Sequence, residues 1–382
     1  MSELVWYFLK LGAVGFGGPA ALVGYMRRDL VETRKLIDES TYNLAIALAQ
    51  IMPGPLAAQT AMAIGYFQGG VTGATLVGLA FILPSFLMVL ALSVGYVTYG
   101  GMPWMQSVFY GIGAVIIAII AVAAYRLARG TNKTDTLLWT ISGVTFAATV
   151  WTGSELAVLF ILSGLTVLAI RAWPGRRAGL MLMTAGLVTA VAVAALEHAL
   201  AGVHSTNGQP VLLQILLFFG KAGSFVFGSG LAIVPFLQQG VVHDFGWLTD
   251  QQFLDAVAVA LITPGPVVIT VAFIGYLVAG VAGAVLAAAG MFLPVYVFTV
   301  VPAPWFARHR NNAQLRAFAT GATAAASGAI AGAVIVLGRQ AIVDVVTATV
   351  ALAGLLLLVR FRVSEPFLVI GAGVAGLVLS RS

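Results

Sequence analysis

Apolar residues fill most of the chain in blocks of about 18–25 positions, separated by short polar segments. A block of that length crosses a hydrocarbon core about 30 Å thick as an α-helix. Seven such elements are predicted first: Leu4–Gly24, Thr41–Phe67, Val71–Tyr99, Trp104–Leu127, Asp135–Val150, Glu155–Ile170 and Ala178–Leu200. Six follow: Val211–Gln238, Asp250–Val278, Val281–Val301, Ala313–Leu337, Ala341–Val359 and Glu365–Leu379.

Composition narrows the class of protein. Hydrophobic residues make up 60% of the 382 positions and charged residues only 8%, against roughly 25% charged in soluble domains. A mean hydropathy of +1.03 leaves no room for a sizeable polar domain. These values argue against a water-soluble enzyme, a nucleic-acid-binding protein and a secreted scaffold. The sequence predicts an all-α polytopic membrane protein whose first partner is the lipid bilayer.

Charge and metal-binding residues add further exclusions. The net charge of +6 comes from basic residues scattered among short loops, which predicts membrane orientation and no nucleic-acid partner. The chain has no cysteine and four dispersed histidines, so we expect no metal and no cofactor. No nucleotide-binding loop is found, and the N-terminus lacks the basic stretch of a cleaved signal peptide.

The chain contains an internal duplication. FLKLGAVGFGGPAALV from Phe8 matches FGKAGSFVFGSGLAIV from Phe219, and the same offset carries IMPGP from Ile51 onto ITPGP from Ile262. A Leu-Pro pair at Pro84 matches one at Pro294 after a one-residue slip. We therefore predict a first repeat over 1–177, a connecting helix and linker over 178–210, and a second repeat over 211–382.

Two elements of each repeat carry a break near the centre. The first contains GFGGP, or FGSG in the second copy, and the next contains PGP. Proline removes a backbone donor and paired glycines favour a bend. Irregular backbone at membrane depth must line a cavity or be buried in protein. We predict that both elements are re-entrant hairpins that enter and leave on one side.

Basic residues test the hairpin interpretation. If both hairpins return to their own side, the loops that carry most of the basic residues lie on one face of the membrane. Only Arg339 and Arg381 fall elsewhere. The residues on the shared face are Arg27, Arg28, Arg34, Lys35, Arg126, Arg129, Lys133, Arg171, Arg176, Arg177, Arg308, Arg310, Arg360 and Arg362. The positive-inside rule then places the N-terminus in the cytoplasm. Element 178–200 has no counterpart in the second repeat, and its extra crossing makes the second repeat begin on the opposite face of the membrane. The repeats are therefore predicted to be inverted, as in many secondary transporters. A duplicated scaffold with proline kinks is the alternative.

Charge and helix breaks indicate an anion site. Lys10 and Lys221 are repeat-equivalent cations inside apolar runs, where a charge is costly and usually functional, although a lysine can also extend to the surface. Helix N-termini after GGP and PGP offer unpaired amides to an anion. The candidate substrate-binding residues are Lys10, Lys221, Phe16, Gly17, Gly18, Phe227, Gly228, Ser229, Gln50, Pro53, Gly54, Pro55, Gln59, Thr263, Pro264, Gly265 and Pro266.

Nearby polar residues have simpler explanations. Threonines such as Thr60, Thr263 and Thr270 often bond only their own helix backbone. Asp38 and Thr249 precede equivalent elements, where helix capping accounts for them. Asp255 could carry a coupling proton, but we expect it to be a first-turn acid or one that extends to the surface.

The motifs resemble a known family. With FLKLGAVGFGGPAALVGYMRRDLVE, LAQIMPGPLAAQTAMAIGY and LVGLAFILPS, the sequence resembles the chromate transporter family across both halves. The resemblance implies efflux of chromate across the bacterial cytoplasmic (inner) membrane and chromate resistance, with sulfate as an analogue. Family motif positions are Lys10, Phe16, Gly17, Gly18, Pro19, Arg27, Gln50, Pro53, Gly54 and Pro55. The second copy departs, with FGSG for FGGP and Gln238-Gln239 for Arg27-Arg28.

The predicted function is therefore secondary transport of a tetrahedral oxyanion by alternating access, not enzymatic catalysis. A channel, or a transporter of another small anion or solute, is the alternative. A membrane-embedded enzyme would need a catalytic constellation within the spans, and the histidines lie at ends or in loops. A homodimer, and the choice between proton coupling and anion exchange, are left open.

Overall fold

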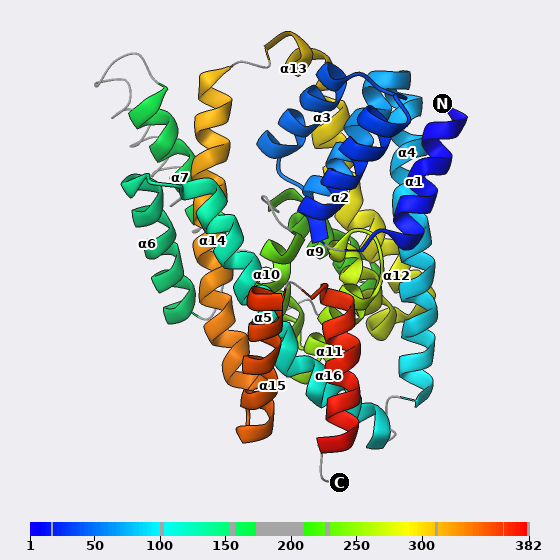
Figure 1. Cartoon of the computed structure of the whole chain (residues 1–382), viewed down its shortest axis with the longest axis vertical. Coiled ribbons are helices and arrows are strands. Elements are labelled where there is room, and N and C mark those ends of the chain that lie inside the picture. The colour runs from blue at the N-terminus through cyan, green and yellow to red at the C-terminus, as the bar shows by residue number, and fades with distance from the viewer. Residues whose placement is uncertain are drawn as a thin grey trace.

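The computed structural model of the chain describes residues 1–16, 18–99, 103–152, 157–172, 210–225, 230–309, 312–361 and 363–379. Within these ranges every regular element is a helix, and four helices are long and apolar enough to cross a membrane: Leu56–Tyr99, Trp104–Asn132, Val267–Arg308 and Ala313–Ala341. The predicted all-α polytopic membrane protein is confirmed (Figure 1). The predicted element 178–200, Gly17, Phe227, Gly228 and Ser229 lie outside the described residues.

The first copy begins with two interrupted helices. Its elements are α1 (Ser2–Val14), α2 (Gly18–Met26), the π-helix η1 (Arg27–Thr33), α3 (Glu39–Ile51) and α4 (Leu56–Tyr99). The helix start at Gly18 has a φ of 73°, and Gly54 of the PGP loop has a φ of 149°. Both conformations favour glycine because it has no Cβ. The predicted helix breaks at GGP and PGP are confirmed.

Helix α4 doubles back on itself at Gly69 and Gly70. Gly70 has φ 61° and ψ −150°, and Gly65 faces Gly73 so closely that neither could carry a Cβ. The arm over residues 56–68 therefore leads away from the PGP break. After the turn, the arm over 71–99 runs back along it and continues to the lower end of the molecule (Figure 1).

The second copy repeats these devices. It comprises α9 (Val211–Phe225), η2 (Gly230–Ile233), α10 (Val234–Gln238), η3 (Gln239–Asp244), α11 (Asp250–Ile262), η4 (Val267–Ile269) and α12 (Thr270–Val300). Gly280 reproduces the φ and ψ of Gly70. The Asp38 carboxylate caps α3 at the Thr41 amide (2.7 Å), and the Thr249 hydroxyl caps α11 at the Gln252 amide (3.2 Å). The capping interpretation of Asp38 and Thr249 is confirmed.

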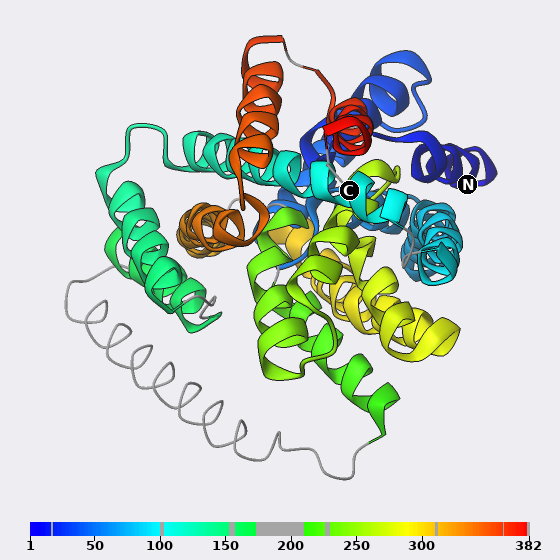
Figure 2. The same cartoon turned by 90° about the horizontal axis from the view of Figure 1, so that it is seen from below.

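The remaining helices are exchanged between the copies. They are α5 (Pro103–Asn132), α6 (Thr136–Thr152) and α7 (Ala157–Arg171) in the first copy, and α13 (Ala303–His309), α14 (Ala313–Ala341), α15 (Val345–Leu356), η5 (Leu357–Phe361) and α16 (Glu365–Leu379) in the second. Helix α14 packs on α6 and α7, whereas α5 packs on α15 and α16 (Figure 2). Small residues allow the close approach, as where Gly328 meets the Ser142 carbonyl.

Helices α2 and α3 lie in the upper part of the molecule and α11 lies in its lower part (Figure 1). This placement is the one expected if the two copies are inverted. The inversion, and the boundaries of the two repeats, stay predictions.

Candidate functional site

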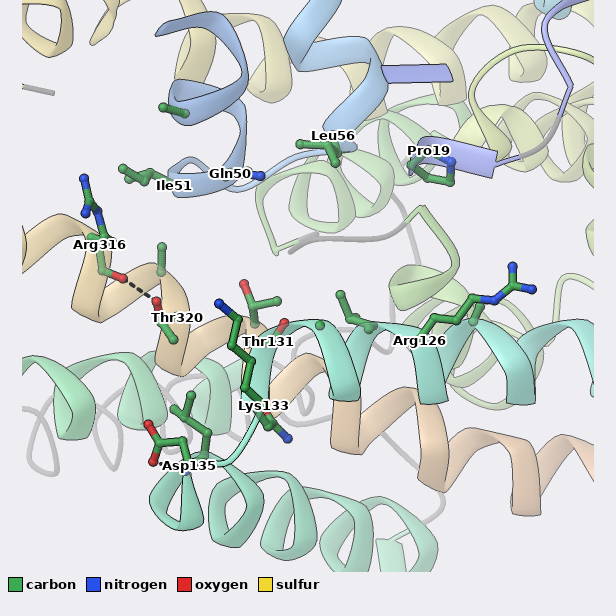
Figure 3. A pocket seen from close by; sticks show the side chains of 18 of the residues that line it. Pro19, Gln50, Ile51, Leu56, Arg126, Thr131, Lys133, Asp135, Arg316 and Thr320 are labelled. Carbon is green, nitrogen blue, oxygen red and sulfur yellow. Dashed lines mark hydrogen bonds between the residues drawn. The ribbon is translucent and has the colours of Figure 1, made fainter. Parts of the chain in front are cut away.

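A cavity of about 1070 Å³ lies beside the helix breaks of the first copy. Its wall includes Gly18 and Pro19 at the start of α2, Ile51 at the end of α3, and Leu56 at the start of α4. From the second copy, Val267 follows directly after the PGP motif. Figure 3 shows the first-copy residues along one side of the cavity.

Helices α5 and α14 supply the opposite wall (Figure 3). Helix α5 contributes Ala123, Arg126, Leu127, Gly130, Thr131 and Asn132, and α14 contributes Arg316, Ala319, Thr320 and Thr323. The loop after α5 and the ends of α7 and α16 add Lys133, Thr134, Asp135, Arg171 and Glu365 to the lining. The cavity thus extends from the helix breaks to the loop after α5.

Basic side chains outnumber acidic ones in this lining. Four are basic and two are acidic: Arg126, Lys133, Arg171, Arg316, Asp135 and Glu365. Arg171 donates a hydrogen bond to Asp135, and this bond lowers the pKa of the Asp135 carboxyl. The charges of Arg171 and Asp135 cancel in this ion pair. The three other basic side chains outnumber Glu365, and their net positive charge favours a small anion.

Glu365 lies at the break in the first hairpin. A Cβ built on Gly18 would be 3.8 Å from both carboxylate oxygens of Glu365. The positive charge of Arg126 also acts on this carboxylate. The cavity therefore brings together a helix N-terminus, an arginine and an acid, where a helix N-terminus and an arginine both attract negative charge.

Asn132 adds an unsatisfied polar atom to the wall. Its side chain is fully buried, and its amide nitrogen donates to the Ser142 hydroxyl at 2.8 Å. Its carbonyl oxygen has no hydrogen-bond partner in the described part of the chain.

Of the predicted site residues, Gly18 and Gln50 line the cavity. The first PGP loop is held from within the protein, since the Gln59 amide donates to the Pro53 carbonyl at 2.7 Å. Gly54 and Pro55 are buried.

The second PGP loop is buried between the copies. Thr263, Pro264, Gly265 and Pro266 are all buried. The Gly265 amide donates to the Gly15 carbonyl at 2.9 Å, joining the second break of one copy to the first break of the other. That amide is therefore not available to an anion in this conformation. The Thr263 hydroxyl bonds its own helix at Val259.

Lys10 and Lys221 lie away from the cavity. Lys10 shares the exposed face of α1 with Trp6 and Val14, because residues three to four apart lie on one face of a helix. The Lys221 ammonium lies 5.8 Å from the centroid of the Phe236 ring, and its side chain is also exposed. Neither lysine lines the cavity, although both are candidate substrate-binding residues on the sequence. Phe16 is likewise 38% exposed and outside the lining.

Sequence reasoning missed the charged residues of the cavity. Arg126 was assigned to a loop, but the helix continues to Asn132 and carries the arginine inside it. Arg316 stands in the first turn of α14 and Glu365 begins α16. The sequence did offer one clue: Arg126 directly follows a long apolar run, and the helix of that run could continue past it.

The expectation for Asp255 was wrong. Its side chain is only 4% exposed and accepts hydrogen bonds from the Tyr96 hydroxyl (2.7 Å) and the Gln251 amide (2.9 Å). Asp255 lies six residues into α11, beyond its first turn, and faces α4 of the other copy. Packing between the copies buries it, so it does not extend to the surface.

The family model described as "Chromate transporter" matches residues 2–170 and 213–377 of this chain. The chain belongs to the chromate transporter family. This family consists of transporters, which supports the prediction that the chain is not an enzyme.

Three relatives span almost the whole chain. It is 55% identical to a chromate transport protein of Cupriavidus metallidurans, covering 99% of this chain and 93% of the relative. It is 51% identical to a probable chromate transport protein of Synechococcus elongatus (99% and 95% covered) and 31% identical to a chromate transport protein of Pseudomonas aeruginosa (98% and 91% covered). No solved structure matches the chain.

Proposed function

We propose that this protein exports chromate, or a similar tetrahedral oxyanion such as sulfate, across the bacterial cytoplasmic membrane by alternating access. Membership of the chromate transporter family supports the substrate class. The observation that carries the proposal is the cavity, which is bounded by interrupted helices and whose charged lining residues are four basic and two acidic side chains. Chromate resistance of the host is the expected consequence of export.

The cavity lining suits a dianion. Removing a doubly charged anion from water is costly unless several donors replace its hydration. Arg126 and Arg316 offer guanidinium groups on two different helices, and the N-terminus of α2, the positive end of its dipole, lies at the same cavity. Gln50 adds an amide at the end of α3. These donors need no metal to hold the substrate.

The cavity opens toward the cytoplasm in this proposal. Lys133 and Arg171 line it and belong to the basic loops that the positive-inside rule assigns to the cytoplasm. On that assignment the N-terminus is cytoplasmic and the conformation faces inward. Chromate would enter from the cytoplasm, and inverted repeats would then exchange conformations to expose it outside.

The membrane potential is sufficient to drive export. Moving one elementary charge through 100 mV changes the free energy by about 2.3 kcal/mol, so a dianion leaving a negative interior gains about 4.6 kcal/mol. This gain needs no nucleotide. One negative charge still leaves if a proton accompanies the dianion, so in either case collapsing the potential should weaken export against a chromate gradient.

Transport into inverted membrane vesicles tests the proposal. Chromate should accumulate saturably, and sulfate, molybdate and phosphate added as competitors define the preferred anion. Arg126→Gln and Arg316→Gln should each reduce uptake at least tenfold. Arg27→Gln is the matched control, because Arg27 pairs with Glu39 on the exposed surface and lies outside the cavity lining.

Two outcomes would contradict the proposal. Uptake that survives both cavity substitutions would remove the arginines from the substrate path. Flux that shows no exchange between labelled and unlabelled chromate would favour a channel, since a channel has no countertransport.

A further inference from the structure

Resting on the proposed function, we propose that Glu365 binds a proton whenever the cavity binds a tetrahedral dianion, so that the protein binds the two together. The Glu365 carboxylate lies in the cavity beside the start of α2, where the positive end of the helix would also attract an anion. The proton binds to the Glu365 carboxylate, and the oxyanion binds in the cavity beside it.

The position of Glu365 is fixed by how α16 packs. Helix α16 runs antiparallel to α5, with Gly376 against the Ser107 carbonyl and Gly111 against the Ala372 carbonyl. Glycines at these points bring the two backbones close together. The packing carries the first residue of α16 toward the cavity end of α5, where Arg126 lies.

The carboxylate faces the same groups that would bind the substrate. Both of its oxygens lie 3.8 Å from the position of a Cβ on Gly18, which begins α2. Glu365 is partly buried, and it lines the same cavity as Arg126 and Arg316. An ionised Glu365 therefore competes with a bound anion for the positive end of α2 and for Arg126.

Few other charged groups face Glu365 in the described ranges. Among the helices packed on α16, α5 contributes Arg126, whose charge acts on Glu365. On α11, Asp255 is bonded to Tyr96 and Gln251. Beside α15, Asp344 accepts from Tyr110 and caps the helix. The cavity wall adds Lys133, Arg316 and the Arg171–Asp135 pair.

Repulsion couples the proton to the anion. A dianion and a carboxylate in one partly desolvated cavity repel each other strongly, because the local dielectric screens them less than bulk water does. Neutralising Glu365 removes the repulsion and frees Arg126 for the substrate. When Glu365 is ionised in the free protein, binding of the dianion must therefore take up one proton from solution. The affinity for the dianion then falls about tenfold for each unit by which the pH rises.

Binding measurements on the purified full-length protein test this inference. Chromate affinity is measured by titration calorimetry across the pH range in which chromate stays a dianion. Wild type should lose affinity about tenfold per pH unit and take up one proton per chromate in weakly buffered solution. Glu365→Gln should bind chromate more tightly at the upper end of the range, with no pH slope and no proton uptake.

Two further variants isolate the effect. Glu39→Gln removes an acid at the surface start of α3 and should keep the wild-type slope. Glu365→Asp retains a titratable group and should restore a slope if Glu365→Gln has lost it.

The outcomes are separable. A wild-type affinity independent of pH, or a Glu365→Gln variant with an unchanged slope, overturns the role of Glu365. Chromate binding without proton uptake by wild type overturns it as well, even if the variants fail to fold. A wild-type protein that does not bind chromate at any pH overturns the proposed function itself.

Discussion

Removing the Tyr96 hydroxyl is expected to open the side of the protein opposite the cavity. This hydroxyl bonds Asp255 at 2.7 Å and so joins α4 of the first copy to α11 of the second. Tyr96 also contacts Phe109 near the start of α5, with ring centroids 5.5 Å apart. The cavity is lined by the last turns of α5 around Arg126, about 25 Å further along the helix. The proposed alternating access requires the joined end to separate when the cavity closes.

The size of the effect follows from the chemistry of the bond. A hydrogen bond to a charged group contributes about 1.5–3 kcal/mol, which corresponds to a shift of roughly 10- to 150-fold in an equilibrium between two conformations. Asp255 keeps its 2.9 Å hydrogen bond from Gln251 in the Tyr96→Phe variant. Because the carboxylate is not left unpaired, we expect the lower end of this range.

Cysteine accessibility measures the shift. The chain has no cysteine, so Val259→Cys introduces a single thiol one helical turn beyond Asp255, at a position only 3% exposed. A membrane-impermeant maleimide applied from the outer side should label this thiol about ten times faster when Tyr96→Phe is also present. Tyr110→Phe is the matched control, since it removes an exposed bond to Asp344. Equal labelling rates in the Tyr96→Phe and parent proteins would refute the reasoning.

Three further predictions concern the helix breaks and caps. Gly265→Leu should abolish chromate uptake into vesicles and lower the thermal stability, because Gly265 has a φ of 96° and a Cβ there would overlap Ser85; a variant with normal uptake would make the tight contact dispensable. Gln59→Leu should destabilise the protein by about 1–3 kcal/mol in denaturant titrations, because the Pro53 carbonyl loses its 2.7 Å donor, and an unchanged unfolding midpoint would contradict this. Hydrogen bonds from Ser40 and Thr41 lower the pKa of Asp38 to about 2, so its cap stabilises the fold above the ordinary value of 3.8 and is lost as pH falls toward about 2. The difference in melting temperature between wild type and Asp38→Ala should therefore disappear over that pH interval, and a constant difference would argue against capping by the carboxylate.

Local chemistry made the helix breaks predictable from sequence. Proline and glycine act on their own backbone, so the PGP motif around Gly54 and the caps at Asp38 and Thr249 could be recognised without knowing their neighbours. The same motifs at one offset identified the duplication, and the matching geometry of Gly70 and Gly280 reflects it.

Side-chain direction was harder to predict because it depends on packing between distant segments. Lys10 is a candidate substrate-binding residue on the sequence, but it lies with Trp6 on the exposed face of α1, and the opposite face packs against the protein. The burial of Asp255 depends on Tyr96, which lies 159 residues away in the chain. The grouping of Arg126, Arg316 and Glu365 around one cavity likewise depends on how α5 and α14 cross between the copies.

The exchange of helices between the copies constrains how such a protein could arise and be divided. Helix α14 is covered by α6 and α7, and α5 is covered by α15 and α16, so each copy completes the other. A polypeptide of half this length built on the same plan would have to assemble in pairs to cover these surfaces. Fusion of two such genes would then have preserved the contacts of an ancestral dimer. If the chain were cut between its halves, each fragment would be stable in the membrane only when assembled with the other.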